Sequence, residues 1–297
     1  MILQTTSLTK RYGRILAVDN LDLEIQEGQV YGILGPNGSG KTTTLGMILG
    51  VTIKTNGHYS WFGKGEGFAL RKRVGAILEH PIFYPYLTAV QNLRIGALIK
   101  DIKKPDFDHL LKLVGLYERR NDPFKTYSLG MKQRLAIASS MLTDPRVLIF
   151  DEPTNGLDPQ GIAEIRRIIL DIRELGKTIV IASHLLDEVQ KVCTHFAVLR
   201  SGKKIFSGEV DDVLNQNSRI EIGCANLERV QKILANDQRV IQMSSENGRL
   251  VTEVEETMTT QDMNRLMIEH DIILNHLVFR RSNLEEQFLA ILKENDD

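Results

Sequence analysis

The segment from Gly35 to Thr42, GPNGSGKT, constrains this chain most, because it matches the pattern GxxxxGK[ST] at every fixed position. It follows the apolar run Gln29–Leu34 and opens a helical pattern from about Lys41 to Leu49. A glycine-rich turn between a strand and a helix curls so that its backbone N–H groups point at phosphate oxygens. We therefore predict a loop that binds the phosphates of a nucleotide, with the contact residues Gly35, Pro36, Asn37, Gly38, Ser39, Gly40, Lys41, Thr42 and Thr43.

A second polar element follows the apolar strand Val147–Phe150, which runs directly into Asp151 and Glu152. In phosphoryl-transfer sites the lysine of the loop reaches the β- and γ-phosphates and the following hydroxyl binds Mg²⁺. These are the roles we expect for Lys41 and Thr42. A carboxylate at a strand end holds Mg²⁺ directly or through water, which suits Asp151, and Glu152 is placed to orient and deprotonate an attacking water.

Short apolar runs alternate with helical patterns through the first two thirds of the chain. The runs are Gln29–Leu34, Val74–Leu78, Val147–Phe150 and Thr178–Ala182, and a long helical zone covers about Thr88 to Leu142. Continuous apolar strands separated by helices indicate an α/β fold, with a parallel sheet covered by helices on both faces.

The composition shifts after about Gly208, and the rest of the chain has the pattern of a small separate unit. We predict in order the strand Arg219–Cys224, the helix Leu227–Ala235, the strands Arg239–Met243 and Leu250–Glu255, the helix Thr260–Ile268 and the strand Ile272–Phe279. This βαββαβ order is the ferredoxin-like pattern. The segment Ser282–Glu285 resembles a capping box that opens a final helix, Leu284–Leu292.

Composition excludes several classes of protein. The chain has 37 Lys and Arg against 38 Asp and Glu, so it lacks the basic excess of nucleic-acid binders, and we expect no nucleic-acid partner. Its two cysteines, Cys193 and Cys224, are too few for a disulfide scaffold and are expected to be buried, reduced thiols of a cytosolic protein. No stretch of 18 uncharged apolar residues occurs and the N-terminus lacks the order of a signal peptide, so any membrane contact is expected through another protein.

Further motifs, in order along the chain, resemble those of the ATP-binding subunit of an ATP-binding-cassette (ABC) transporter. Tyr127–Arg134 (YSLGMKQR) resembles the signature motif, and Asn155–Asp158 (NGLD) resembles the D-loop. His184, after the strand Thr178–Ala182, resembles the switch histidine, and Tyr12 resembles the aromatic residue that stacks on adenine. The resemblance covers about residues 2–210.

This resemblance implies an ABC cassette of the P-loop NTPase kind over residues 1–215. Its parts would be a RecA-like parallel-sheet core, an N-terminal antiparallel β part and a helical subdomain at about 86–142, followed by an accessory or regulatory domain at 216–297. It also implies that two cassettes face each other head to tail with ATP between them. Ser128 and the N–H of Gly130 would then contact the γ-phosphate held by the other subunit, while His184 hydrogen-bonds the γ-phosphate and Asp158 belongs to the nucleotide-binding set.

Two departures from the family pattern stand out. The signature motif has Leu129 where the family has glycine and Met131 where it has glutamine. Glu79 takes the place of the usual Q-loop glutamine, and it could ligate Mg²⁺ or be a salt-bridging surface residue. A glutamate here resembles the branch of exporters for lantibiotics and bacitracin. The aromatic cluster Phe83–Leu87 either faces the membrane partner or packs under the helical subdomain.

The function implied is an ATPase, with ATP and Mg²⁺ as cofactors, that drives separate transmembrane permease subunits as a homodimer or with a second cassette. Such a subunit would lie on the inner face of the cell membrane and would power export. One alternative is an ABC protein of translation or DNA maintenance. The single cassette and the separation of only 87 residues between Lys41 and Ser128 argue against it. A P-loop kinase or GTPase leaves Ser128, Gly130, Asp158 and His184 unexplained, and a regulator that binds ATP without turnover is opposed by Glu152.

Overall fold

The computed structural model describes residues 1–79, 81–215, 218–246, 248–255, 257–280 and 288. The chain separates into two compact units, Met1–Ser207 and Gly208–Asp297, and each is described by itself. Among the described residues, no helix combines the length and the apolar character needed to cross a bilayer. Both cysteines are free; Cys193 is buried as predicted, whereas Cys224 is only half-buried.

The first unit is built on a six-stranded sheet in the order β5-β6-β7-β3-β8-β9. Its strands are β3 (Val30–Leu34), β5 (Val74–Ile77), β6 (Val147–Asp151), β7 (Thr178–Ser183), β8 (His195–Arg200) and β9 (Lys203–Glu209). The neighbours from β5 to β8 pair in parallel, and β3, β6 and β7 are buried along their whole length. Apolar strands of this kind need cover on both faces, which confirms the α/β fold expected from the apolar runs.

A second sheet of the same unit is antiparallel and has the order β2-β1-β4. It consists of β1 (Leu3–Tyr12), β2 (Ile15–Ile25) and β4 (Asn56–Trp61). Helix α1 (Lys41–Ile48) contacts strands of both sheets, and the Trp61 indole N–H donates to the Ile48 carbonyl at 2.9 Å. One apolar core therefore joins the two sheets around α1.

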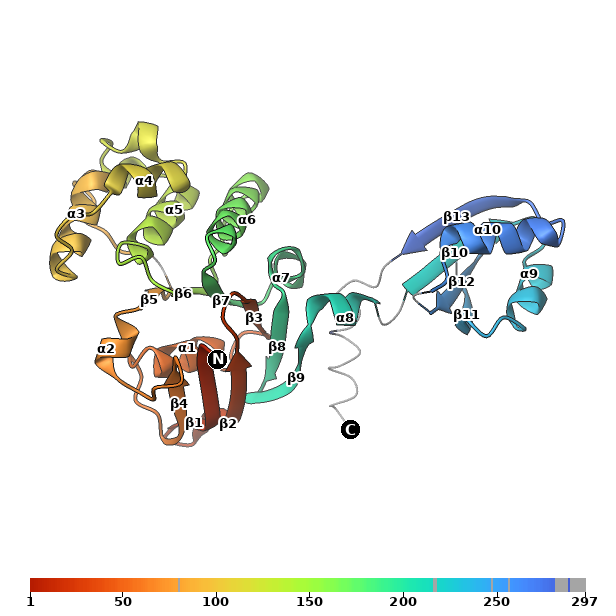
Figure 1. Cartoon of the computed structure of the whole chain (residues 1–297), viewed down its shortest axis with the longest axis horizontal. Helices are drawn as coiled ribbons and strands as arrows, with labels where there is room; N and C mark the ends of the chain where they lie inside the picture. The colour runs from red at the N-terminus through yellow and green to blue at the C-terminus, as the bar shows by residue number, and fades with distance from the viewer. Residues whose placement is uncertain (80, 216–217, 247, 256, 281–287, 289–297) are drawn as a thin grey trace. The chain divides into compact units, whose positions relative to one another are not determined.

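Helices occupy most of the remaining first unit (Figure 1). They are α2 (Phe68–Arg71), α3 (Ala89–Ile99), α4 (Phe107–Leu113), the 3₁₀ turns Tyr117–Arg119 and Phe124–Thr126, α5 (Leu129–Ser140), α6 (Pro159–Glu174) and α7 (Leu186–Val192). The predicted helical zone is thus divided into short helices, and Thr88 begins α3 with a capping box completed by Gln91. The end of α5 packs tightly on β5, since a Cβ added at Gly75 would lie 2.2 Å from the Ser140 carbonyl oxygen.

The second unit contains a four-stranded antiparallel sheet in the order β11-β12-β10-β13. Its elements are the short helix α8 (Val210–Asn215), β10 (Ser218–Cys224), α9 (Leu227–Leu234), β11 (Val240–Glu246), β12 (Arg249–Val254), α10 (Thr260–Glu269) and β13 (Leu274–Arg280). From β10 onward this is the βαββαβ order predicted from the sequence. The predicted final helix Leu284–Leu292 lies outside the described residues, apart from Phe288.

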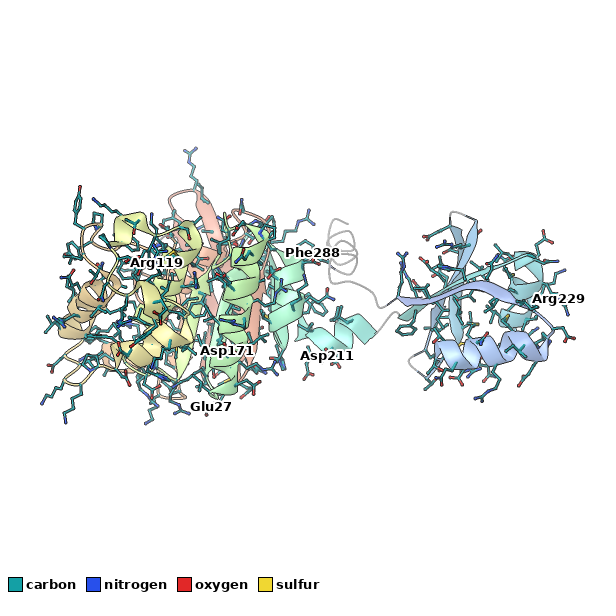
Figure 2. All side chains as sticks on the ribbon, turned by 90° about the horizontal axis from the view of Figure 1, so that it is seen from above. Glu27, Arg119, Asp171, Asp211, Arg229 and Phe288 are labelled. Carbon is teal, nitrogen blue, oxygen red and sulfur yellow. The ribbon has the colours of Figure 1, made fainter. Side chains whose placement is uncertain are left out.

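The second unit has an apolar core of its own, formed by the sheet and its two helices. Its core residues include Ile220 and Ile222 of β10, Val230 of α9, and Met263 and Met267 of α10, all completely buried. The side chains of this unit are drawn in Figure 2, where Arg229 extends from α9. Its Nη2 donates to the His270 carbonyl at 2.8 Å and so ties α9 to the end of α10.

Since each unit has its own core, we predict that deleting residues 216–297 leaves the cassette folded. A protein of residues 1–215 should unfold in one cooperative thermal transition, with the full chain as its control. Aggregation of the shortened protein, or the absence of a cooperative transition, would mean that the chain is one continuous folding unit.

Candidate functional site

The phosphate-loop sequence lies between the end of β3 and the start of α1. Gly40 caps α1 with a φ of 103°, a conformation that favours glycine, and a Cβ there would lie 2.5 Å from the Ala17 carbonyl oxygen. At Gly35 a Cβ would lie 2.3 Å from the Leu199 carbonyl oxygen. Glycine is therefore required at both positions, because the loop backbone passes so close to β2 and β8 that a side chain has no room.

The ammonium group of Lys41 lies inside the curl of this loop and is almost completely buried. It donates to the carbonyl oxygens of Gly35 at 2.7 Å and of Pro36 at 3.3 Å, and it lies 3.4 Å from Glu152 Oε1. A buried cation held at a glycine-rich turn is placed to meet the negative charge of a phosphate group.

Asp151 ends β6 as a buried carboxylate beside Thr42, with which it shares a side-chain hydrogen bond. Burial raises the pKa of Asp151, and the hydrogen bond from Thr42 opposes this shift. The negative charges of Glu152 and Glu79 raise the pKa further, whereas Lys41 lowers it. In the described part of the chain, Asp151 Oδ1 and the Ser39 hydroxyl are buried without a hydrogen-bond partner. An unpaired carboxylate oxygen next to a threonine hydroxyl fits the oxygen ligands that Mg²⁺ requires.

Glu152 stands where β6 ends, with a φ of 48° that is uncommon for a residue with a side chain. Its N–H donates to the Ala182 carbonyl at 2.9 Å. Its carboxylate lies between two cationic or polar groups: Oε2 is 2.8 Å from His184 Nδ1, and Oε1 is the atom next to Lys41. Parallel pairing of β6 with β7 brings Glu152 and His184 together, although 32 residues separate them.

The signature-like and D-loop-like residues form a second cluster, away from the phosphate loop. Ser128 caps α5 by accepting from the Met131 N–H at 3.3 Å, and Asp158 caps α6 by accepting from the Gly161 N–H at 3.0 Å. The two helix starts contact each other: a Cβ on Gly130 would lie 3.9 Å from Leu157 Cδ2. Figure 1 shows α5 beside α6 and away from α1.

The structure also describes Tyr12, Glu79 and the aromatic segment Phe83–Leu87, which the sequence analysis singled out. Tyr12, at the end of β1, is 46% exposed and carries the Lys10 ammonium 4.6 Å above its ring. Glu79 is exposed after β5 with a φ of 57° and makes no ion pair within the part of the chain that the structure describes. The aromatic cluster divides between its two interpretations, because Phe83 packs against Phe124 at 5.2 Å while Tyr86 is 76% exposed.

Sequence reasoning missed one polar contact near the site, the ion pair between Arg166 on α6 and Glu188 on α7. No spacing signal could have revealed it, because it depends on how two helices meet after different strands. A phosphate loop after β3, two carboxylates at the end of β6 and a histidine after β7 together define a P-loop NTPase.

Comparison with known proteins narrows this class. Residues 18–155 match the family model described as ABC transporter. The bacitracin transport ATP-binding protein BcrA of Bacillus licheniformis is 36% identical over 98% of this chain and 97% of its own length. The lantibiotic transport ATP-binding protein SrtF of Streptococcus pyogenes is 38% identical over 71% of this chain and 92% of its own length.

Among solved structures, cbiO1 of Clostridium perfringens, part of the ABC transporter complex cbiONQ, superposes with a TM-score of 0.66. It is 29% identical, and the match covers 79% of this chain and 95% of cbiO1. The chain therefore belongs to the ABC transporter family, as an ATP-binding and ATP-hydrolysing subunit.

Replacing Asp151 by Asn should stabilise the nucleotide-free protein, because it removes a carboxylate that is costly to ionise in its buried position. Because the pKa of Asp151 is higher in the folded state than in the unfolded state, the folded state binds more protons at any pH between these two pKa values. Stability from Asp151 is therefore lost as pH rises from the unfolded-state pKa through the folded-state pKa, and the full penalty applies above the folded-state pKa. We expect the Tm of the variant to be about 2–4 °C higher at the alkaline end of the pH series, with the gain shrinking toward acid pH.

The measurement is thermal unfolding of both proteins without nucleotide across a pH series. Asp171→Asn is a suitable control, since this carboxylate stands on α6 outside the site, 3.9 Å from Arg167 (Figure 2). A Tm for Asp151→Asn that is lower than that of the parent chain throughout the series would contradict the inferred cost of the buried charge.

Proposed function

We propose that this chain powers export through separate transmembrane permease subunits, by closing two cassettes around ATP and reopening them after hydrolysis. The observation that carries the proposal is the division of the predicted site into two clusters. Lys41, Glu152 and His184 form one cluster, while Ser128 and Asp158 lie in the other. Two copies facing head to tail would complete each ATP site from both clusters.

In the first cluster, the loop from Gly35 to Thr43 binds the phosphates of ATP, and Lys41 meets the β- and γ-phosphates. Thr42 and Asp151 would hold Mg²⁺, with Glu79 as a further oxygen donor, and the cation would neutralise charge on the phosphate oxygens. The unpaired Asp151 Oδ1 and its hydrogen-bonded neighbour Thr42 support this assignment. Tyr12 stacks on the adenine ring.

Glu152 acts as the base in the same cluster. One carboxylate oxygen accepts the proton of the water that attacks the γ-phosphorus, and the other stays close to Lys41. His184 orients that carboxylate through the 2.8 Å contact and contacts the γ-phosphate. Each of these groups lies at the end of a buried strand or in the loop that directly follows it.

The second cluster would meet the ATP held by the other cassette. Ser128 begins α5, whose first backbone N–H groups, that of Gly130 among them, suit a phosphate oxygen. Leu129 replaces a family glycine here, and its side chain is 43% exposed beside Gly156. Asp158 caps the start of α6, and α6 contacts α5.

Relatives named for bacitracin and lantibiotic transport support a peptide as the cargo. Their similarity to this chain, together with Glu79, supports placing this chain in the peptide-exporting branch of the family. The permease would place the cassettes on the inner face of the cell membrane. Residues 216–297 would form an accessory domain that regulates or supports the dimer.

Glu152→Gln should lower ATP turnover by about 10²–10⁴-fold, because the amide cannot accept the proton of the attacking water. ATP should remain bound and the dimer should accumulate, as seen by size-exclusion chromatography with ATP. Glu174→Gln, an exposed carboxylate at the end of α6, is the matched control and should keep full activity. Rapid turnover by Glu152→Gln would remove Glu152 from the role of base.

The partner is tested by purifying the tagged chain from gently solubilised membranes of its native cell. We expect a multi-spanning membrane protein in stoichiometric amount, identified by mass spectrometry. Recovery of the chain from the soluble fraction without such a partner would contradict the transporter role in its simple form.

A further inference from the structure

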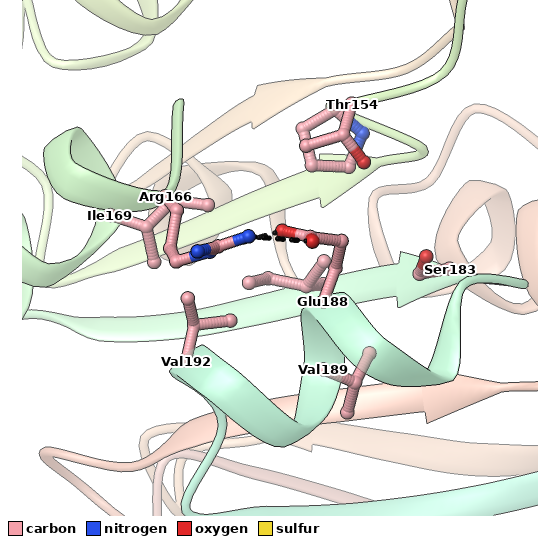
Figure 3. A pocket seen from close by; sticks show the side chains of 9 residues that line it. Thr154, Arg166, Ile169, Ser183, Glu188, Val189 and Val192 are labelled. Atoms are coloured by element: carbon pink, nitrogen blue, oxygen red, sulfur yellow. Dashed lines mark hydrogen bonds and ion pairs between the residues drawn. The ribbon is translucent and has the colours of Figure 1, made fainter. Parts of the chain in front are cut away.

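Arg166 and Glu188 form a two-bond ion pair between helices α6 and α7, drawn with dashed lines in Figure 3. Arg166 Nη2 lies 2.7 Å from Glu188 Oε1, and Nε lies 3.2 Å from Oε2. The side chains are only 28% and 15% exposed. Parallel hydrogen bonds between a planar guanidinium and a carboxylate fix direction as well as distance, so this pair holds the two helices in one relative orientation.

The two helices follow the two loops that carry the proposed catalytic groups. Helix α6 begins at Pro159, after the loop that starts with Glu152, and α7 begins at Leu186, two residues after His184. Thr154 of the first loop and Ser183, the last residue of β7, line the same small cavity as the ion pair (Figure 3). The ion pair is thus a polar connection between the two helices that follow these loops.

Hydrogen bonds among the described residues also tie these loops to each other. The β6–β7 ladder ends at the pair Asp151–Ala182, before either catalytic group. Beyond it, the ties between the loops are the Glu152 N–H to the Ala182 carbonyl and the contacts of Glu152 with the His184 N–H and ring. Beside the ion pair, the buried side chains of Ile169, Val189 and Val192 pack the two helices together.

We propose that Arg166 and Glu188 are positioning residues for ATP hydrolysis. By holding α6 against α7 they keep the Glu152 carboxylate and the His184 ring at hydrogen-bonding distance while ATP is bound. The proposal rests on the roles proposed above for Glu152 and His184. Misplacing a catalytic group by about 1 Å costs about 10²-fold in rate, so a contact outside the site can govern turnover.

A neighbouring cation does not duplicate the pair. Lys191 Nζ lies 3.9 Å from Glu188 Oε1 on the same helix, α7, and is 44% exposed. It can reduce the charge of Glu188 but cannot link α7 to α6. Loss of the Arg166 guanidinium therefore removes the connection between the helices even though Glu188 keeps a cation nearby.

Arg166→Gln and Glu188→Gln are each expected to lower kcat for ATP by about 10- to 100-fold while KM for ATP stays unchanged. The phosphate loop is intact in both variants, so ATP binding should not weaken. Arg167→Gln is the matched control, because Arg167 is 69% exposed and lies 3.9 Å from Asp171 of the same helix. It should keep the kcat of the parent chain.

Charge exchange separates positioning from a general loss of stability. The double variant Arg166→Glu with Glu188→Arg should recover most of the lost kcat, because the pair can form again with its members reversed. If Arg166→Gln does not fold, Arg166→Lys replaces it in the test, since lysine keeps the charge but not the two-bond geometry. We then expect a folded protein with lower kcat and unchanged KM.

Wild-type kcat in the folded single variants would overturn the proposal. It would also be overturned by a loss of kcat that matches the unfolded fraction at the assay temperature, or by an exchange variant no faster than the slower single one. These outcomes differ from failure of the catalytic assignment. Turnover by Glu152→Gln would remove the base, whereas an inactive Glu152→Gln beside fully active Arg166 and Glu188 variants would remove only the positioning role.

Discussion

Parallel pairing of three buried strands is the constraint on which the site depends. Because β6, β7 and β3 are neighbours that point the same way, their ends lie at one edge of the sheet. The phosphate loop, the carboxylates at the end of β6 and the histidine after β7 converge there, although the loop lies more than 100 residues before the carboxylates and the histidine lies 32 residues after Glu152. The apolar residues of each strand stabilise the sheet by their burial. Each strand also ends where a polar element of the site begins, at the same edge of the sheet.

The energetics of that edge favour function over stability. Asp151 is buried, has one oxygen without a partner in the described part of the chain, and lies near the charges of Glu152 and Glu79. Lys41 is the cation that counteracts them. This arrangement of charges costs free energy in the nucleotide-free protein, and the cost falls when a further positive charge binds at the site. Binding of a metal–nucleotide complex then stabilises the folded protein as well as preparing it for chemistry.

The sequence was informative where local pattern decides structure. The glycines at positions 35 and 40 belong to a short motif that is recognisable by its spacing alone, and the buried strands are continuous apolar runs. The βαββαβ order of the second unit followed from its alternating patterns. The sequence was uninformative about contacts between elements that are distant along the chain. The contact of Leu129 with Gly156, the partial exposure of Cys224 and the Arg166–Glu188 pair depend on helix and strand placement that no spacing encodes.

The left-handed backbone of Glu152 has a consequence of its own. A residue with a side chain at a φ of 48° carries a cost on the order of 1 kcal/mol that glycine or asparagine largely avoids. A library of variants screened only for resistance to heat should therefore become enriched in glycine or asparagine at position 152, while a screen for ATP turnover should retain glutamate. The two enrichment profiles would diverge most sharply at a position of this kind, so the catalytic edge of the sheet could be located from sequencing counts alone.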